Sequence, residues 1–212
     1  MLPISNLLAF AIAAAVIVAI PGPSVLFTIS RALTLGRRAA LLTVVGNAVG
    51  VSAQVVTVAF GIGAVVERSI VAFTIVKYLG AAYIVYLGVQ AVRHRRAFTD
   101  GLAQRAAPVT PLRAMRDGAI VGATNPKTIV VFVAVMPGFT DPAAGHLQWQ
   151  LLLLGSVFPV IALLLDSVWA LAAGTSRDWL ARSPRRLAAI GGTGGLVMIG
   201  LGTSLAVTGR KD

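Results

Sequence analysis

A proline-containing break, Pro21-Gly22-Pro23, interrupts the first apolar segment of the chain. Proline has no N–H, and its ring clashes with the carbonyl group four residues earlier. The two prolines should therefore free the carbonyl groups of Ile17 and Ala19, which could accept hydrogen bonds from an ammonium group. Ser24 and the free N–H groups of the helix that follows could bind an anion. The break thus predicts a site for a small zwitterion; a simple proline kink is the alternative.

A second break, Asn125-Pro126-Lys127, interrupts the fourth apolar segment. Asn125 supplies both a donor and an acceptor. Lys127 falls in the first turn of the helix that follows, where the helix dipole disfavours a cation. A lysine this far from water needs an anionic partner. That partner could be the carboxylate of a substrate or Asp166; a structural Lys127–Asp166 pair or a snorkelling lysine is the alternative.

Three further polar residues within the apolar segments are candidates for a functional role. Asp166, in the fifth segment, is a functional candidate because acids inside membrane spans are rare and costly. Burial favours its neutral form and a nearby lysine its charged form, a competition that a proton-coupled carrier could use; an acid at a helix end that reaches water is the alternative. Asn47 and Gln54 share one face of a helix. Hydrogen bonding between helices is the first interpretation of both, and lining a solute pathway is the second.

The elements that carry these residues are long and apolar. Of the 212 residues, 57% are hydrophobic and 12% charged, and the mean hydropathy is +0.87. A soluble domain has about 25% charged residues and could not hide this much apolar surface from water. The sequence predicts an all-α polytopic membrane protein with six transmembrane helices, the first a retained span rather than a signal peptide. The apolar segments are 4–33, 39–65, 70–92, 113–137, 148–173 and 187–208.

Lysine and arginine are distributed unevenly between the loops. Thirteen of the 18 follow the first, third and fifth segments, and three lie on the opposite side. The positive-inside bias predicts that the three basic loops are cytoplasmic and that both termini are outside. The same bias accounts for the net charge of +11, which in a soluble protein would suggest a nucleic-acid partner. We therefore expect that the protein lies in a lipid bilayer and that it does not bind nucleic acid.

A polar linker, 93–112, separates two halves, 1–92 and 113–212, with three apolar segments each. An odd number of spans per half places the halves in opposite orientations, and each half begins with a broken segment. This pattern predicts an inverted repeat with a transport site at the breaks. Two Gly-x-x-x-Gly pairs, Gly46/Gly50 and Gly191/Gly195, would let helices approach closely. Packing within one molecule is favoured over a homodimer seam for these pairs.

Other functional classes find little support in the sequence. The chain has no cysteine and only two histidines, both near loops, so thiol chemistry and thiolate or histidine metal sites are not expected. No Ser/His or His/carboxylate arrangement indicates an enzyme. We expect no catalytic residue, metal or cofactor. A membrane-embedded enzyme or scaffold is disfavoured.

In this order and at these separations, the features resemble the lysine exporter (LysE/RhtB) family of amino-acid exporters over essentially the whole chain. The residues that carry the resemblance are Pro21-Gly22-Pro23, Gly46 and Gly50, Lys77-Tyr78-Leu79-Gly80-Ala81-Ala82-Tyr83, Gly118, Asn125-Pro126-Lys127, Pro137-x-Phe139, Asp166 and the glycine-rich last segment. The resemblance implies an inner-membrane exporter of amino acids or their derivatives, driven by the proton motive force, without an organic cofactor. It does not fix the substrate, and residues 119–124 are less polar than in some members.

The resulting hypothesis is an alternating-access exporter in which the two breaks face each other near the midplane. Freed carbonyls would take the ammonium group of the substrate, whereas half-helix N–H groups and Lys127 would take its carboxylate. Asp166 would couple transport to a proton. A passive channel or an importer on the same architecture is the alternative function.

Overall fold

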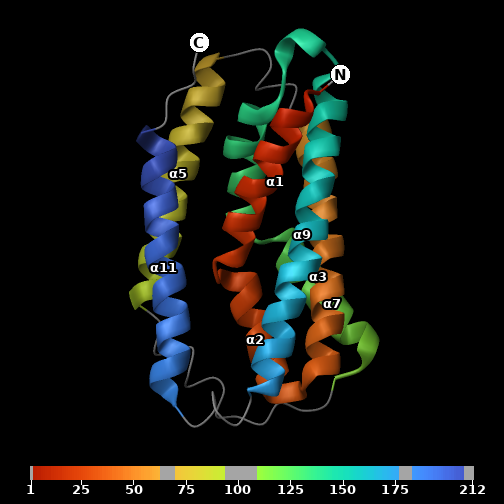
Figure 1. The fold of residues 1–212 in the computed structure, drawn as a ribbon, viewed down its shortest axis with the longest axis vertical. Coiled ribbons are helices and arrows are strands. Elements are labelled where there is room, and N and C mark those ends of the chain that lie inside the picture. The colour runs from red at the N-terminus through yellow and green to blue at the C-terminus, as the bar shows by residue number, and fades with distance from the viewer. Residues whose placement is uncertain (1, 63–69, 94–108, 177–182, 208–212) are drawn as a thin grey trace.

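The computed structural model describes residues 2–62, 70–93, 109–176 and 183–207, and these ranges are helical without any strand. The helices run along the long axis of an elongated bundle (Figure 1). In chain order they are α1 (Ile4–Ala19), α2 (Pro23–Leu35), α3 (Arg37–Thr57), η1 (Val58–Ile62), α5 (Ile70–Arg93), α7 (Pro111–Ala123), α8 (Pro126–Val130), η2 (Val131–Val135), η3 (Met136–Phe139), η4 (Pro142–Ala144), α9 (Leu147–Thr175) and α11 (Pro184–Val207).

The first proline-containing break separates α1 from α2, whose axes differ by 49°. Ile20, the residue before Pro21, is extended with φ −76° and ψ 121°, because the ring of a following proline disfavours the helical conformation. Gly22 precedes the first residue of α2. Proline is well tolerated there, since the first N–H of a helix has no partner within the helix. The sequence thus ends one helix and starts the next within three residues.

The second break separates α7 from the helical stretch that begins with α8, with a bend of 40°. The side chain of Asn125 accepts a hydrogen bond from the backbone N–H of Lys127, 3.1 Å away, and so caps α8. Asparagine is among the preferred residues at this position. Pro126 occupies the first turn of the helix, as Pro23 does in α2.

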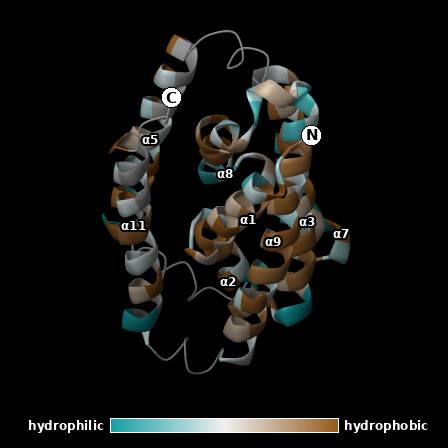
Figure 2. Cartoon of the chain, turned by 45° about the horizontal axis from the view of Figure 1, so that its top comes forward, coloured by the Kyte–Doolittle hydropathy of each residue, from teal (hydrophilic) through white to brown (hydrophobic). Residues whose placement is uncertain are grey.

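Several helices have the length and composition of membrane spans. The stretches Arg37–Gly61 and Leu147–Thr175 each suffice, and the two bent pairs raise the number to as many as four. Helices α5 and α11 contain shorter apolar stretches, Tyr78–Gln90 and Ala188–Gly200. Apolar residues cover most of α1, α3 and α9 (Figure 2). The outward face of α1 exposes an apolar residue at every fourth position, as expected of a helix that faces lipid: Ile4, Leu8, Ile12 and Val16.

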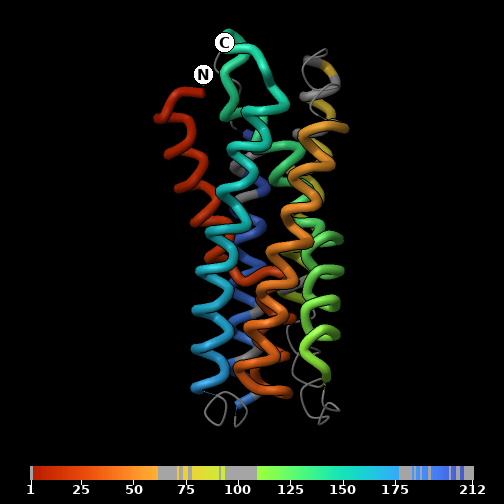
Figure 3. Tube along the Cα trace, turned by 90° about the vertical axis from the view of Figure 1, so that its right-hand side faces the viewer, coloured from red at the N-terminus to blue at the C-terminus, as the bar shows by residue number. Residues whose placement is uncertain are grey.

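Glycines bring pairs of helices into close contact. Helices α3 and α7 lie side by side (Figure 3), and the backbone of α7 at Met115 and Ala119 lies against Gly46 and Gly50 of α3. Helices α5 and α11 form a second pair (Figure 1), in which Gly88 and Gly195 each lie against the carbonyl oxygen of the other. The Gly46/Gly50 pair therefore packs within the molecule, as favoured from the sequence.

Two hydrophobic clusters flank the first break. One joins α1, α3, η2 and α9 around residues such as Phe10, Phe132 and Phe158. The other joins α2, α3 and α9 around Val25 and Val44. The interrupted backbone between α1 and α2 lies where these clusters meet, so polar groups there are held between two apolar layers.

Candidate functional site

The two breaks meet in the interior of the bundle. The amide nitrogen of Asn125 donates a hydrogen bond to the hydroxyl oxygen of Ser24 at 2.7 Å. The ammonium nitrogen of Lys127 donates to the carbonyl oxygens of Ile17 and Ile20, at 2.6 and 2.8 Å. Ser24, Asn125 and Lys127 are all buried. Side chains of the second break therefore satisfy polar groups of the first.

One of the two carbonyl groups that accept hydrogen bonds from the Lys127 ammonium group differs from the pair expected from the sequence, Ile17 and Ala19. Ile17 and Ile20 accept hydrogen bonds from Lys127, whereas no such bond reaches Ala19. The reason is local: α1 already ends at Ala19, and the extended Ile20 turns its carbonyl away from the helix. The bound cation is also a side chain of the protein. These carbonyls are therefore occupied in this conformation and are not open to a substrate.

Lys127 has a partner that its sequence context did not suggest. The free carbonyls at the end of α1 carry the negative end of the helix dipole, so they offset the charge of a buried ammonium group. Its side chain passes Gly22, where an added methyl group would lie 3.0 Å from Cδ of Lys127. Among the described residues, no ion pair joins Lys127 to Asp166. The hydrogen-bond partners of the Lys127 ammonium group in this structure are thus two peptide carbonyls.

The N-terminus of α2 opens toward the same region. The first hydrogen bond of the helix runs from Leu26 N to Gly22 O, and no side chain caps the helix. The N–H groups of Ser24 and Val25 therefore lie in an uncapped first turn. Such a turn carries a partial positive charge and favours an anion.

Gln54 fastens α3 to the second break. Its amide nitrogen donates to the carbonyl oxygen of Ala123 at 2.8 Å, and its amide oxygen accepts from the hydroxyl of Thr128 at 2.7 Å. Both polar atoms of the side chain have partners. Gln54 thus takes the interhelical role that was its first interpretation, and it does not line the cavity described below.

Asn47 and Asp166 form a second buried pair, between α3 and α9. The amide nitrogen of Asn47 donates to the Oδ2 atom of Asp166 at 3.3 Å. The Oδ1 atoms of both side chains are buried and have no hydrogen-bond partner. Buried oxygen atoms without a hydrogen-bond partner are uncommon in native proteins. This pair therefore lacks a hydrogen-bond donor for its two Oδ1 atoms.

A small cavity joins these groups. It is lined by the polar residues Ser24, Asn47, Asn125, Lys127, Thr128 and Asp166, by Gly22, and by the apolar residues Val18, Val25, Val51, Phe158 and Ala162. The space that the centre of a water molecule can reach is about 20 Å³. That volume holds about one water molecule. The cavity in this structure is therefore too small for an amino acid.

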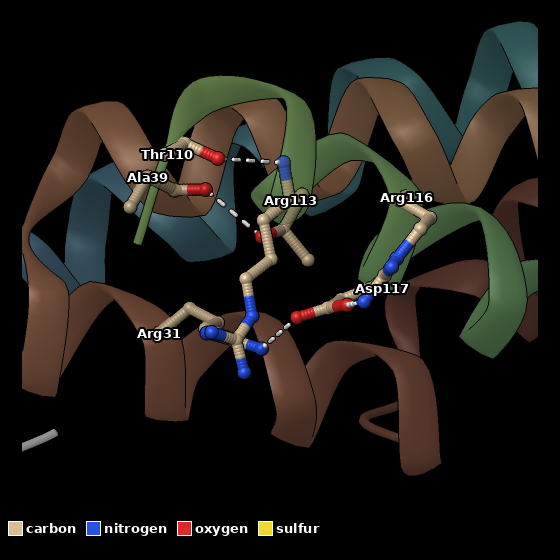
Figure 4. Close-up of polar contacts among 7 residues, drawn as sticks. Arg31, Ala39, Thr110, Arg113, Arg116 and Asp117 are labelled. Atoms are coloured by element: carbon tan, nitrogen blue, oxygen red, sulfur yellow. Dashed lines mark hydrogen bonds and ion pairs between the residues drawn. The ribbon is translucent and has the colours of Figure 1, made fainter. Parts of the chain in front are cut away.

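A charged cluster links the half-helices that lie on the same side of the two breaks. Arg31 of α2 and Asp117 of α7 form an ion pair of 2.8 Å, and Arg116 approaches the other oxygen of Asp117 at 3.4 Å (Figure 4). Arg31 also lies over the ring of Phe27. The ion pair is one-fifth exposed or less on each side, so it lies at the edge of the packed interior.

Most of the residues singled out in the sequence lie at this site. The cavity brings together Gly22, Ser24, Asn47, Asn125, Lys127 and Asp166. Pro21, Pro23 and Pro126 shape the adjoining backbone, and Ile17 meets Lys127. Sequence reasoning missed Ile20, Thr128 and the Arg31–Asp117 pair. Ile20 carried a signal, because a residue before proline leaves the helical conformation; the ion pair joins residues 86 positions apart and carried none.

No group of three His, Cys, Asp or Glu side chains in the described part of the chain is arranged to hold a metal ion. The site is instead built from amides, hydroxyls, peptide groups, one lysine and one aspartate. It could bind a small solute with both a positive and a negative group.

The sequence profile of the LysE type translocator family matches residues 15–209. The chain belongs to the LysE type translocator family. A membrane protein of Vibrio cholerae without an assigned function is 35% identical to this translocator over 94% of this chain and 95% of its own length. A homoserine/homoserine lactone efflux protein of Salmonella typhi is 30% identical over 88% of both chains. A leucine efflux protein of Salmonella choleraesuis is 25% identical over 95% of this chain and 94% of its own.

No solved structure matches the translocator. The family and the apolar helices identify it as a membrane transport protein, and no family of enzymes is indicated.

Proposed function

We propose that this translocator exports amino acids or closely related zwitterions across the inner membrane by proton antiport. Two relatives of comparable length are named as efflux proteins for homoserine or homoserine lactone and for leucine, which supports an amino-acid-like substrate. The cavity supports the same class of solute, because it presents an uncapped helix N-terminus, one lysine and one aspartate within an apolar wall.

The proposed mechanism is alternating access between two inverted halves, 1–92 and 113–212, of three spans each, joined by the linker 93–112. Residues 94–108 of the linker lie outside the described part of the chain. The three basic loops face the cytoplasm and both termini face outward. In support, α1 begins and α11 ends at one end of the bundle, whereas α2 ends at the other (Figure 1).

The observation that carries the proposal is the meeting of the two breaks through Lys127 and Asn125. Irregular backbone within a membrane is tolerated only where it is buried in protein or lines a hydrated cavity. Here the breaks are buried and border the small cavity, and transporters bind their solutes where discontinuous helices meet. The carboxylate of the substrate binds at the first turn of α2, next to Ser24 and Asn125, with Lys127 supplying positive charge. Asp166 carries the coupling proton.

Efflux from cells that produce the protein tests this function. Cells loaded with radiolabelled L-homoserine, L-leucine, L-threonine or L-lysine are diluted into label-free medium, and the label that leaves is compared with that from cells carrying an empty vector. We expect accelerated efflux of at least one amino acid, which slows when a protonophore collapses the proton gradient. Efflux of all four at the vector rate would contradict the proposal.

A passive channel or an importer on the same fold is the alternative. Only a carrier coupled to protons concentrates its solute against a gradient. Inside-out vesicles energised by respiration separate the cases: an exporter accumulates the amino acid in the lumen, a channel equilibrates it, and a proton-coupled importer empties the lumen.

A further inference from the structure

Two buried oxygen atoms at the cavity have no hydrogen-bond partner, the Oδ1 atoms of Asn47 and Asp166. The side chains are 4% and 3% exposed, so bulk water does not compensate for the missing bonds. Both residues line the cavity beside the meeting point of the breaks. The other buried amides close by, Gln54 and Asn125, have partners for their side-chain oxygens. The deficit is therefore specific to one corner of the site.

Rearranging the atoms of this pair does not remove the deficit. Turning the amide of Asn47 over would place its oxygen against the carboxylate, so two acceptors would face each other. Protonating Asp166 would give it a donor, but its Oδ1 atom has no partner of either kind. The pair consequently lacks an external donor, and the charge of the carboxylate favours a cationic one.

The ammonium group of Lys127 does not fill this role. It is held by the carbonyl oxygens of Ile17 and Ile20 at 2.6 and 2.8 Å, and no ion pair with Asp166 is formed among the described residues. None of the other basic side chains that the structure describes lines the cavity, so a cation for Asn47 and Asp166 is expected from outside the protein. The geometry points to Asn47 and Asp166 as the subsite for the ammonium group of the transported amino acid, an inference that rests on the proposed function.

This assignment moves the ammonium group away from the carbonyls of the first break. The carboxylate then lies at the opposite side of the cavity, at the uncapped first turn of α2 near Ser24 and Asn125. A substrate in this orientation has its two charged groups matched by charges of opposite sign, since Asp166 faces the ammonium and Lys127 and the helix terminus face the carboxylate.

The other residues that line the cavity indicate which class of substrate side chain it accepts. Within the described part of the chain, Asp166 is the only acid and Lys127 the only base that line the cavity, and the other lining residues include Val51, Phe158 and Ala162. A zwitterion without a charged side chain uses both charges. The additional cation of lysine or arginine would find no second acid and would be desolvated without compensation. The preferred substrates are therefore amino acids with uncharged side chains.

The assignment is tested with the purified full-length protein in proteoliposomes. Exchange of radiolabelled L-leucine and L-homoserine is measured in the presence of unlabelled competitors. The competitors are the same two amino acids, L-lysine, and the deaminated counterparts of leucine and homoserine, 4-methylpentanoate and 4-hydroxybutanoate, which lack the ammonium group. The wild type should prefer each amino acid over its deaminated counterpart. In Asp166→Asn, which keeps the shape of the side chain, and in Asn47→Ala, that preference should fall by about tenfold or more. Inhibition by the deaminated acids should change little.

Ser52→Ala is the matched control. Ser52 lies on α3 like Asn47, but it is exposed and its hydroxyl donates to Ala48 O of its own helix. This variant should keep the wild-type preference. The inference is overturned if both site variants still prefer the amino acids as strongly as the wild type, or if L-lysine competes as well as L-leucine. A wild type that carries neither labelled amino acid would overturn the proposed function, and this inference with it.

Discussion

The ammonium nitrogen of Lys127 lies 2.6 Å from the carbonyl oxygen of Ile17, so a residue of the second break closes the open end of α1. A second bond, to Ile20, completes the link. Bonds from a charged donor are about twice as strong as neutral ones, yet they can be exchanged for water when a cavity opens. In the proposed mechanism, such a contact would hold the two halves together in one state and release them in another.

Replacing Lys127 by methionine should reduce both stability and transport. Methionine keeps much of the length of the side chain but leaves the carbonyls of Ile17 and Ile20 without donors. Each buried group without a partner costs about 1–3 kcal/mol. We expect a lower temperature of thermal unfolding in detergent and an efflux rate reduced by about tenfold or more. If Lys127→Met exports as fast as the wild type, Lys127 has no role in the proposed mechanism.

Gly22→Ala should displace Lys127 without abolishing folding. The added methyl group would meet Cδ of Lys127 at 3.0 Å and Nζ at 3.4 Å, which is closer than ordinary contact, but a flexible side chain can give way. We expect the protein to accumulate normally in the membrane and to export more slowly than the wild type, by a factor of about two to ten, which corresponds to about 0.4–1.4 kcal/mol. Equal efflux by the two proteins would show that Lys127 tolerates the shift.

The seam between α3 and α7 should not tolerate even one added methyl group. A Cβ atom at Gly46 would overlap the carbonyl of Met115, and backbone cannot move aside as a side chain does. Gly46→Ala should therefore reduce the amount of folded protein, measured by size-exclusion chromatography of a fluorescent fusion. Gly200→Ala is the control, because nothing lies within 4 Å of a Cβ atom there and alanine favours a helix. Equal yields of the two variants would contradict the close packing of α3 against α7.

Much of the site could be predicted because proline acts locally. The sequence places both breaks correctly, since the missing N–H and the ring of proline end a helix whatever surrounds it. Burial of Asn47, Lys127 and Asp166 also followed, because they are polar residues within apolar segments. Family and membrane class were recognisable from ordered motifs spread over the whole chain.

The partners of these residues could not be predicted, because they depend on how distant segments pack. The sequence indicated that Lys127 needs an anionic partner, but it did not indicate that the ammonium group also donates to the carbonyls of Ile17 and Ile20. A peptide carbonyl carries no residue-specific signal, so composition cannot reveal it as a cation's partner. Likewise the missing donor at Asp166 appears only once α3 and α9 are placed side by side.

The Arg31–Asp117 pair should restrain opening toward its end of the bundle. It joins α2 to α7 at 2.8 Å, so widening the cavity on that side separates its charges. The sequence has no cysteine, which allows Val25→Cys, at the cavity wall, to report access through its rate of reaction with N-ethylmaleimide. A partly exposed pair contributes up to about 1 kcal/mol, so Asp117→Asn should raise the rate by about two- to fivefold. Exchanging the two charges, Arg31→Asp with Asp117→Arg, should return the reaction rate to that of the protein with Val25→Cys alone.

Asp166→Asn should separate coupled transport from exchange. Asparagine matches the shape of aspartate but cannot take up and release a proton. Inside-out vesicles with a proton gradient should therefore accumulate amino acid with the wild type and not with this variant. Exchange of labelled for unlabelled amino acid needs no net proton movement, so at saturating concentration it should persist, although with weaker affinity because the ammonium loses a charged partner.

The comparison distinguishes a proton carrier from a residue that only supports the fold. A structural defect would lower accumulation and exchange together, whereas loss of coupling lowers accumulation alone. Nigericin provides the control for the wild type: once it collapses the gradient, wild-type vesicles should behave like those with Asp166→Asn. If the variant still accumulates amino acid against its gradient, the coupling proton resides elsewhere, and Asp166 would remain only as a partner of the ammonium group.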